Sequence, residues 1–302
     1  MTRDELFEQL SLKGKDNRNI ALPNELYPLL LQWSQEGLIK STHIGLTWSY
    51  LYLVTFLYRY AIYDRFLPNT EQIKVMLGYS AKDCRIDYLI KKNGLLDQHQ
   101  LTESTNNFPV HVETVQNGLS INPQFTHLLD FDKAYVKQYK TDKKIGRTSY
   151  CKKPLFAFNR QPYEQGTFYD ISNTTLIPYK VFEFCMRKDD LGCTAFYIYS
   201  YLVHMNDVYE SDFKCTTNKL AKQIGLSEKT ITRYMNVMRG YRMLDVQFNM
   251  KYFTLNWADG EFKASNLLTN TYTSFSTVQV PYKKLPFKTQ YEHQLHEYQT
   301  GG

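Results

Sequence analysis

The apolar residues of segment 215–244 recur at intervals of three and four, which is the period of an amphipathic helix. The pattern breaks once, at Gly225, where the end of a helix favours a residue that tolerates a positive φ. The spacing therefore predicts two short helices joined by a tight turn. Their buried faces are expected to hold Leu220, Ala221 and Ile224 in the first helix and Ile231, Met235 and Met238 in the second.

The polar residues of the same segment agree with this prediction. Thr217 and Ser227 stand at the two expected helix starts, where a hydroxyl oxygen can accept a hydrogen bond from an unpaired backbone N–H. The outward residues of the second helix are of types that contact base edges and phosphates in a DNA groove. They are Lys229, Thr230, Thr232, Arg233 and Asn236. The segment is interpreted as a helix-turn-helix, and the alternative is an ordinary helical hairpin with a solvated polar face.

Two short alternating runs follow this segment, Val246–Phe248 and Tyr252–Leu255, with a polar turn at 249–251 between them. Such a pattern predicts a β-hairpin. Because a hairpin directly after a recognition helix is a wing, the carboxy-terminal part of the chain is expected to form a winged helix.

An earlier part of the chain repeats this order. Thr70 is expected to cap a short helix, Gly78 to form the turn and Ser80 to cap a second helix, each 147 residues before its counterpart. Two strands around 105–107 predict another wing. The likeness continues upstream, where Leu22-Pro23 resembles Ile177-Pro178 and the aromatic-rich segment 48–63 resembles 195–209. We therefore predict a mainly α fold with small β-wings (α+β), built from two tandem winged helix-turn-helix domains.

The two copies differ in the charge of their second helix. The first copy offers Ser80, Lys82 and Arg85 to DNA, but it also carries Asp83 and Asp87, whose carboxylates would oppose phosphates. Specific contacts are therefore expected in the second copy. The first copy is expected to bind more weakly, to bind a different half-site, or to serve as a protein interface.

The chain is expected to divide into five parts. These are an N-terminal arm (1–19), a first winged-helix domain (20–117), a basic linker region (118–172), a second winged-helix domain (173–260) and a C-terminal arm or tail (261–302). Within the linker region the basic run 140–153 includes Lys143, Lys144 and Arg147. Such a run favours contact with the DNA backbone or a minor groove through counterion release, and a solvated flexible linker fits it equally well.

Composition limits the remaining classes of function. The chain has 302 residues, a net charge of +6 and five cysteines without a CxxC pair. This charge is compatible with nucleic acid. The cysteines indicate neither a zinc site nor a disulfide framework, which favours a reducing cytoplasm. The most apolar run, 50–58, is too short to cross a bilayer, so no membrane association is expected.

Motifs for catalysis are absent from the sequence. It contains no GxxxxGK[ST] or GxGxxG phosphate loop and no pair of histidines separated by one apolar residue. His293 and His296 lie three residues apart beside Glu292 and Glu297, but no further ligand cluster stands out to complete a metal site. No enzymatic activity, metal or cofactor is therefore predicted.

The order of elements, with Ile177–Phe182, Leu191–Leu202 and then the helix-turn-helix, resembles the winged-helix replication proteins of Gram-positive plasmids and phages. The resemblance implies a DNA-binding initiator that attaches to repeated origin sites and recruits host replication proteins without hydrolysing nucleotide. It places origin contacts on the outward residues of the second helix and a phosphate contact on Lys251.

We therefore expect a cytoplasmic, non-enzymatic, sequence-specific double-stranded DNA-binding protein that initiates replication of a plasmid or phage. A transcriptional regulator of a mobile element would use the same surface. A protein-interaction adaptor would keep the fold without DNA binding. Repeated sites favour the first role and a palindrome favours the second. Two recognition helices in one chain can read two half-sites, so both a monomer and a homodimer are compatible with the sequence.

Overall fold

The computed structural model describes residues 1–10, 18–117, 120–143, 145–146, 149–158, 166–210, 212–248, 265–280 and 288–289. The protein is a mixed α+β structure with small sheets. It divides into two compact units: unit 1 holds residues 1–23 and 46–189, and unit 2 holds residues 24–45 and 190–302. Across the described ranges no helix combines the length and apolar character that crossing a membrane requires.

Over its described residues, unit 1 contains several helices and three antiparallel strand pairs, β1–β6, β2–β5 and β3–β4. Its helices are α1 (Arg3–Leu10), α3 (Ile44–Arg59), whose first two residues belong to unit 2, α4 (Thr70–Met76), α5 (Asp87–Ile90), α6 (Leu95–Gln98), α7 (Lys133–Asp142), α8 (Leu155–Phe158) and α9 (Tyr179–Arg187). Its strands are β1 (Asn19–Pro23), β2 (Thr102–Thr105), β3 (Pro109–Asn117), β4 (Ser120–His127), β5 (Cys151–Pro154) and β6 (Thr174–Pro178).

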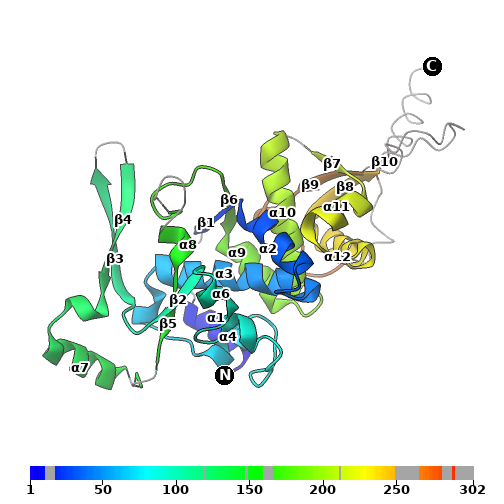
Figure 1. Ribbon diagram of the computed structural model, residues 1–302. Helices are drawn as coiled ribbons and strands as arrows, with labels where there is room; N and C mark the ends of the chain where they lie inside the picture. The colour runs from blue at the N-terminus through cyan, green and yellow to red at the C-terminus, as the bar shows by residue number, and fades with distance from the viewer. Residues whose placement is uncertain are drawn as a thin grey trace, which may run out of the picture. The chain divides into compact units, whose positions relative to one another are not determined.

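Unit 2 contains a group of helices and one sheet of strand order β10-β8-β9-β7 (Figure 1). In this sheet β10 is parallel to β8, and the other neighbours are antiparallel. The helices are α2 (Leu26–Gln35), α10 (Gly192–Tyr209), α11 (Thr217–Ile224) and α12 (Glu228–Gly240). The strands are β7 (Phe213–Cys215), β8 (Leu244–Phe248), β9 (Ser265–Thr269) and β10 (Lys288–Thr289).

The core of unit 1 is built around α3, which is apolar on nearly all sides and is therefore buried on nearly all sides. Its tyrosine rings lie in the core, and two of their hydroxyl groups donate to backbone carbonyls of neighbouring segments. The Tyr52 hydroxyl donates to the Ile177 carbonyl at 2.9 Å, and the Tyr50 hydroxyl reaches the Ile90 carbonyl at 3.4 Å. These two tyrosines thus add buried apolar area while their hydroxyl groups stay hydrogen-bonded.

The core of unit 2 is built in the same way around α10. Phe196, Ile198 and Leu202 of this helix are fully buried. The Tyr199 hydroxyl donates to the Asn270 carbonyl at 2.7 Å, and the Asn206 side chain donates to the Leu267 carbonyl at 2.8 Å. These bonds attach α10 to β9 and the residue that follows it.

The structure differs from the expected domain boundaries in three places. The expected N-terminal arm contains α1, whose apolar side chains are fully buried in unit 1. The expected linker, 118–172, contains β4, α7, β5 and α8, all of which belong to unit 1. Helix α2 belongs to unit 2, whereas β6 and α9 belong to unit 1. The local pattern identified helices but could not show which core each apolar face covers.

The expected first wing around 105–107 is also wrong. Strand β2 ends at Thr105 and pairs with β5, far along the chain, whereas β3 pairs with β4. The β3–β4 register extends to Asn117 opposite Ser120, so the two strands that pair after β2 are β3 and β4, and residues 105–107 do not form the turn of a hairpin (Figure 1). Phe108, directly before β3, is buried, which fixes the chain there and separates β2 from β3.

Candidate nucleic-acid interface

Helices α11 and α12 form the predicted pair with a tight turn at Gly225. This glycine has φ +72 and ends α11, as the sequence pattern required. The apolar faces are placed as expected, because Leu220 and Ile224 of α11 and Ile231 and Met238 of α12 are fully buried. The helix pair is therefore held by its apolar side and exposes the opposite side.

Of the two predicted caps, one is confirmed and one is wrong. Ser227 caps α12, since its hydroxyl oxygen accepts from the Thr230 N–H at 3.1 Å. The cap of α11 is Thr216, whose hydroxyl oxygen accepts from the Lys219 N–H at 3.1 Å, and Thr217 is the first residue inside the helix. The sequence offered two adjacent threonines, and only the backbone path shows which one precedes the helix.

The exposed side of α12 carries the residues that were predicted to face DNA. Lys229, Thr232 and Arg233 are exposed, and Thr230 and Asn236 are half-buried. Among the described residues neither Lys229 nor Arg233 has a carboxylate within ion-pair distance, and the Arg233 guanidinium lies 5.5 Å from the Tyr234 ring centre. Their positive charges therefore face solvent and are available to an anion.

Sequence reasoning missed the basic residues that surround α12. Lys219 and Lys222 on α11, Lys214 on β7 and Arg242 after α12 are all exposed. The acidic Glu228 at the start of α12 is bonded to the Asn218 side-chain amide. The helical spacing of Lys219 and Lys222 could have identified them, because residues three apart share one face of a helix.

The strand that follows α12 belongs to a sheet. β8 pairs antiparallel with β9, with Leu244 opposite Thr269 and Phe248 opposite Ser265. The predicted second strand, 252–255, and Lys251 lie outside the described residues. β9 also pairs with β7, so a sheet follows α12 directly and joins it to the strand before α11.

The first copy lacks the predicted second helix. α4 and the left-handed Gly78 (φ +83) are present, but α4 is capped by Asn69 in a reciprocal bond with Gln72, and not by Thr70. In the fully described segment 78–94 no helix begins at Ser80, and the next helix, α5, is short and holds only Asp87–Ile90. The likeness between the two copies therefore ends at the turn.

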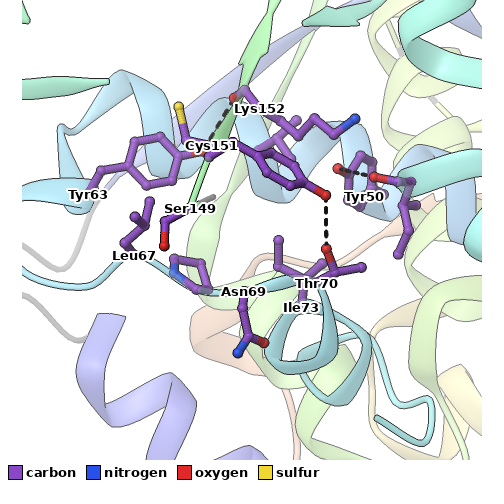
Figure 2. Close-up of a pocket in the computed structure, with 13 residues that line it drawn as sticks. Tyr50, Tyr63, Leu67, Asn69, Thr70, Ile73, Ser149, Cys151 and Lys152 are labelled. Atoms are coloured by element: carbon purple, nitrogen blue, oxygen red, sulfur yellow. Dashed lines mark hydrogen bonds between the residues drawn. The ribbon is translucent and has the colours of Figure 1, made fainter. Parts of the chain in front are cut away.

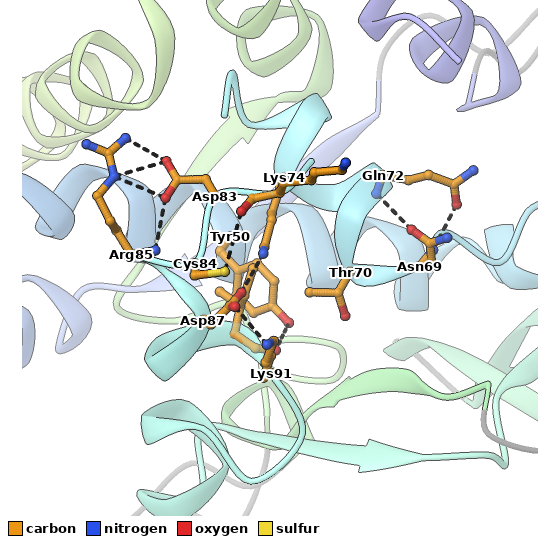
Figure 3. Close-up of polar contacts among 12 residues, drawn as sticks. Tyr50, Asn69, Thr70, Gln72, Lys74, Asp83, Cys84, Arg85, Asp87 and Lys91 are labelled. Atoms are coloured by element: carbon orange, nitrogen blue, oxygen red, sulfur yellow. Dashed lines mark hydrogen bonds and ion pairs between the residues drawn. The ribbon is translucent and has the colours of Figure 1, made fainter. Parts of the chain in front are cut away.

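Local polar contacts explain this difference (Figure 3). An oxygen of Asp83 accepts from the Arg85 backbone N–H at 2.9 Å, and the same carboxylate pairs with the Arg85 guanidinium at 2.6 Å. Such a short-range bond competes with helical hydrogen bonds. Ser80, Lys82 and Arg85 are exposed, but they do not share the face of one helix.

Asp87 is half-buried, and its carboxylate is neutralised by ion pairs, so it does not repel phosphates as the sequence suggested. It pairs with the buried Lys74 of α4 at 2.5 Å and with Lys91 at 2.7 Å (Figure 3). Burial alone would raise the pKa of Asp87, but the bonds with the two ammonium groups outweigh it and hold that pKa below its usual value. The ion pair between Lys74 and Asp87 links the short helix α5 to α4.

Unit 1 also contains a cavity of about 190 Å³ beside α4 (Figure 2). Tyr50, Tyr63 and Lys152 line it, and the Thr70 hydroxyl lies 3.2 Å from the Tyr150 hydroxyl at its edge. The Lys152 ammonium is bound to Asp97 at 2.7 Å and to the Lys91 carbonyl at 3.0 Å. The lysine charge that lines this cavity is thus compensated within the protein and is not offered to a ligand.

The basic segment before residue 153 is partly helical. The expected linker region holds helix α7 (Lys133–Asp142), which is capped by the Asp132 carboxylate. Lys143 is exposed at its end, whereas Lys144 and Arg147 lie outside the described residues. One flank of α7 carries Lys133, Lys137 and Lys140, here called the α7 lysine row, at positions i, i+4 and i+7.

The α7 lysine row has no ion-pair partner within the part of the chain that the structure describes. Lys133 and Lys137 are exposed, and Lys140 is half-buried. The helix is fixed by Tyr139, whose hydroxyl donates to the Asp64 carboxylate at 2.7 Å. The row is therefore a second positively charged surface, which the spacing of the lysines in the sequence could have identified.

No protein-family model, curated protein or solved structure matches the chain. His293 and His296, which were considered and rejected as metal ligands, lie outside the described residues.

Proposed function

We propose that this protein binds double-stranded DNA sequence-specifically, with α12 as the helix that enters the major groove. One observation carries the proposal: the buried face and the caps fix α12 rigidly, while its opposite face presents Lys229, Thr232 and Arg233 to solvent, with no carboxylate partner among the described residues. Arg and Lys bind guanine and phosphate, Asn binds adenine, and Thr binds either. A helix of this length fits the major groove.

The surroundings of α12 support the same function. The exposed lysines of α11 and β7 add positive charge around the helix, and phosphate contacts position a protein on a duplex before bases are read. The sheet that contains β8 and β9 stands in the place of a wing. We therefore treat unit 2 as a winged helix and unit 1 as a diverged copy that has lost its second helix.

The proposed biological role is initiation of replication on a plasmid or phage. Its support is the resemblance of the sequence to replication proteins and the presence of two repeats in one chain. A transcriptional regulator would bind through the same face of α12, so the arrangement of the cognate sites separates the two roles. Repeats within an origin support initiation, and a palindrome over a promoter supports regulation.

Selection of bound duplexes from a random-sequence pool, followed by affinity measurement at two salt concentrations, tests the proposal. Arg233→Ala is expected to weaken the selected duplex by about 1 to 3 kcal/mol and to relax the preference at one base pair. Lys92→Ala, which removes an exposed positive charge in unit 1, is the matched control and should change the affinity little. An absence of any enriched sequence and of salt-dependent binding would leave a protein-interaction adaptor as the better explanation.

A further inference from the structure

The pair β1–β6 is symmetric with respect to the sequence repeat. Leu22 and Ile177 are equivalent residues, 155 positions apart, and the same offset relates the whole of β1 to the whole of β6. In the antiparallel register Ala21 lies opposite Leu176, which is its own equivalent, and the residues on either side pair symmetrically about this point. Two equivalent strands that pair in this way have the register of an isologous contact between identical subunits.

The helix after β1 packs within unit 2, the unit of the second repeat. Tyr27 of α2 is buried, and its ring lies 5.1 Å from the Tyr201 ring and 6.0 Å from the Tyr197 ring of α10. It also stacks on His204 at 5.3 Å. α2 thus covers the central helix of the repeat to which it does not belong.

The helix after β6 packs in the reciprocal way, within unit 1. Phe182 of α9 is the residue 155 positions after Tyr27, and its ring stacks on Tyr52 of α3 at 5.0 Å. Tyr179 of the same helix stacks on Phe56 at 3.9 Å. Equivalent aromatic residues therefore cover the central helix of the opposite repeat, so the two repeats have exchanged their first helices.

The exchanged α2 reaches the turn between α11 and α12. A Cβ atom at Gly225 would lie 2.8 Å from Ile44 Cδ1 and 3.0 Å from Leu31 Cδ1, so this turn is packed tightly against α2 and the residue that begins α3. In addition, the Tyr197 hydroxyl, in the helix that Tyr27 covers, bonds to the Ile224 carbonyl at 3.3 Å. The position of α12 thus depends on a segment that lies about two hundred residues earlier in the chain.

We propose that the two repeats form a covalently joined, helix-exchanged pair in which α2 of the first repeat is a positioning element for the DNA-reading helix of the second. The part that concerns DNA rests on the proposed function above. Tyr27, Leu31 and Ile44 act through the turn at Gly225 and do not contact DNA. A consequence is that the carboxy-terminal repeat is incomplete without residues 24–45, although the sequence repeat begins after them.

Hydrogen exchange of the full-length protein tests the exchange without any DNA. Tyr27→Ala should accelerate amide exchange in α11 and α12 about tenfold or more and leave the centre of α3 unchanged, because the lost contacts lie in unit 2. Phe182→Ala, the equivalent substitution, should accelerate exchange in α3 and leave α11 and α12 unchanged. Tyr27→Phe should preserve the protection. Acceleration by Tyr27→Ala in α3 instead, or equally in both units, would refute the exchange.

DNA binding tests the positioning role, with the duplex that the unmodified protein selects as the probe. Tyr27→Ala should weaken binding about tenfold or more without changing the slope of log affinity against log salt, since no phosphate contact is removed. Tyr27→Phe should bind normally. Normal binding by Tyr27→Ala would refute the positioning role. Failure of the unmodified protein to select any duplex would refute the proposed function and leave the exchange to be judged by hydrogen exchange alone.

Discussion

Gly225→Ala is the substitution that most directly tests the packing of the turn in unit 2. Two costs are expected from the structure. The left-handed backbone, φ +72, costs an alanine roughly 1 kcal/mol. The added methyl group would lie 2.8 Å from Ile44 Cδ1, and overpacking of this kind costs about 1 to 3 kcal/mol. The free energy of unfolding of unit 2 should therefore fall by about 2 to 4 kcal/mol.

Gly37→Ala separates the two costs. Gly37 has φ +77 and also lies in unit 2, and a Cβ atom there would meet no other described atom within 4 Å, so only the backbone cost applies. This variant should lose about 1 kcal/mol. The difference between the two alanine variants, about 1 to 3 kcal/mol, measures the contact of the turn with α2 and Ile44.

Native-state hydrogen exchange of the α10 amides is the suitable assay, because a protein of two units need not unfold in one step. A cycle with Ile44→Ala adds a direct check. Removing the Cδ1 atom should relieve part of the clash, so the double variant should be more stable than the sum of the single effects predicts. Equal losses for Gly225→Ala and Gly37→Ala, within about 0.5 kcal/mol, would show that α2 does not pack against the turn.

Four further changes have definite expected outcomes. Thr216→Ala should destabilise unit 2 by about 1 kcal/mol, because it removes the cap of α11. Thr217→Ala should be nearly neutral when measured by the same hydrogen exchange of the α10 amides. Lys74→Met should lower the free energy of unfolding of unit 1 by about 3 kcal/mol, because the Asp87 carboxylate is then left with the more exposed Lys91 as its ion-pair partner. The pKa of Asp87 is lower in the folded than in the unfolded protein, so the ionised carboxylate stabilises the fold. This stabilisation is fully present above the pKa of the unfolded state, about 4, and is lost as the pH falls through the pKa of the folded state. Unfolding of the Asp87→Asn variant as a function of pH should therefore show a smaller loss of stability in acid. Replacing the α7 lysine row with alanine should reduce the salt slope of DNA binding by up to about 3, and an unchanged slope would remove α7 from the interface.

The helix pair α11–α12 could be predicted from the sequence because its determinants are local. The intervals of three and four place the apolar residues on one face, and Gly225 and Ser227 mark the ends of the two helices. The outward position of Lys229 and Arg233 follows from the same period. Predicting these positions requires only residues that lie close together in the sequence, because one turn of an α-helix contains about 3.6 residues.

The first copy shows where a local pattern is insufficient. Its cap, turn and apolar positions resemble those of the second copy, yet the chain after Ser80 forms no matching helix. The Asp83 carboxylate bonds to the backbone of Arg85, and Asp87 turns inward to the buried Lys74. The first contact competes with helical hydrogen bonds, and the second depends on α4 being already in place.

The sequence by itself determined the elements that local periodicity and end signals define: the two central aromatic helices, the turn at Gly225, the exposed basic face of α12 and the existence of a repeat. Only the tertiary structure decided which core each element joins. An amphipathic helix such as α2 or α9 has an apolar face that either repeat can bury, and burial is non-directional. The choice is made by long-range packing, in the contacts of Tyr27 with α10 and of Phe182 with α3, which no interval along the chain encodes.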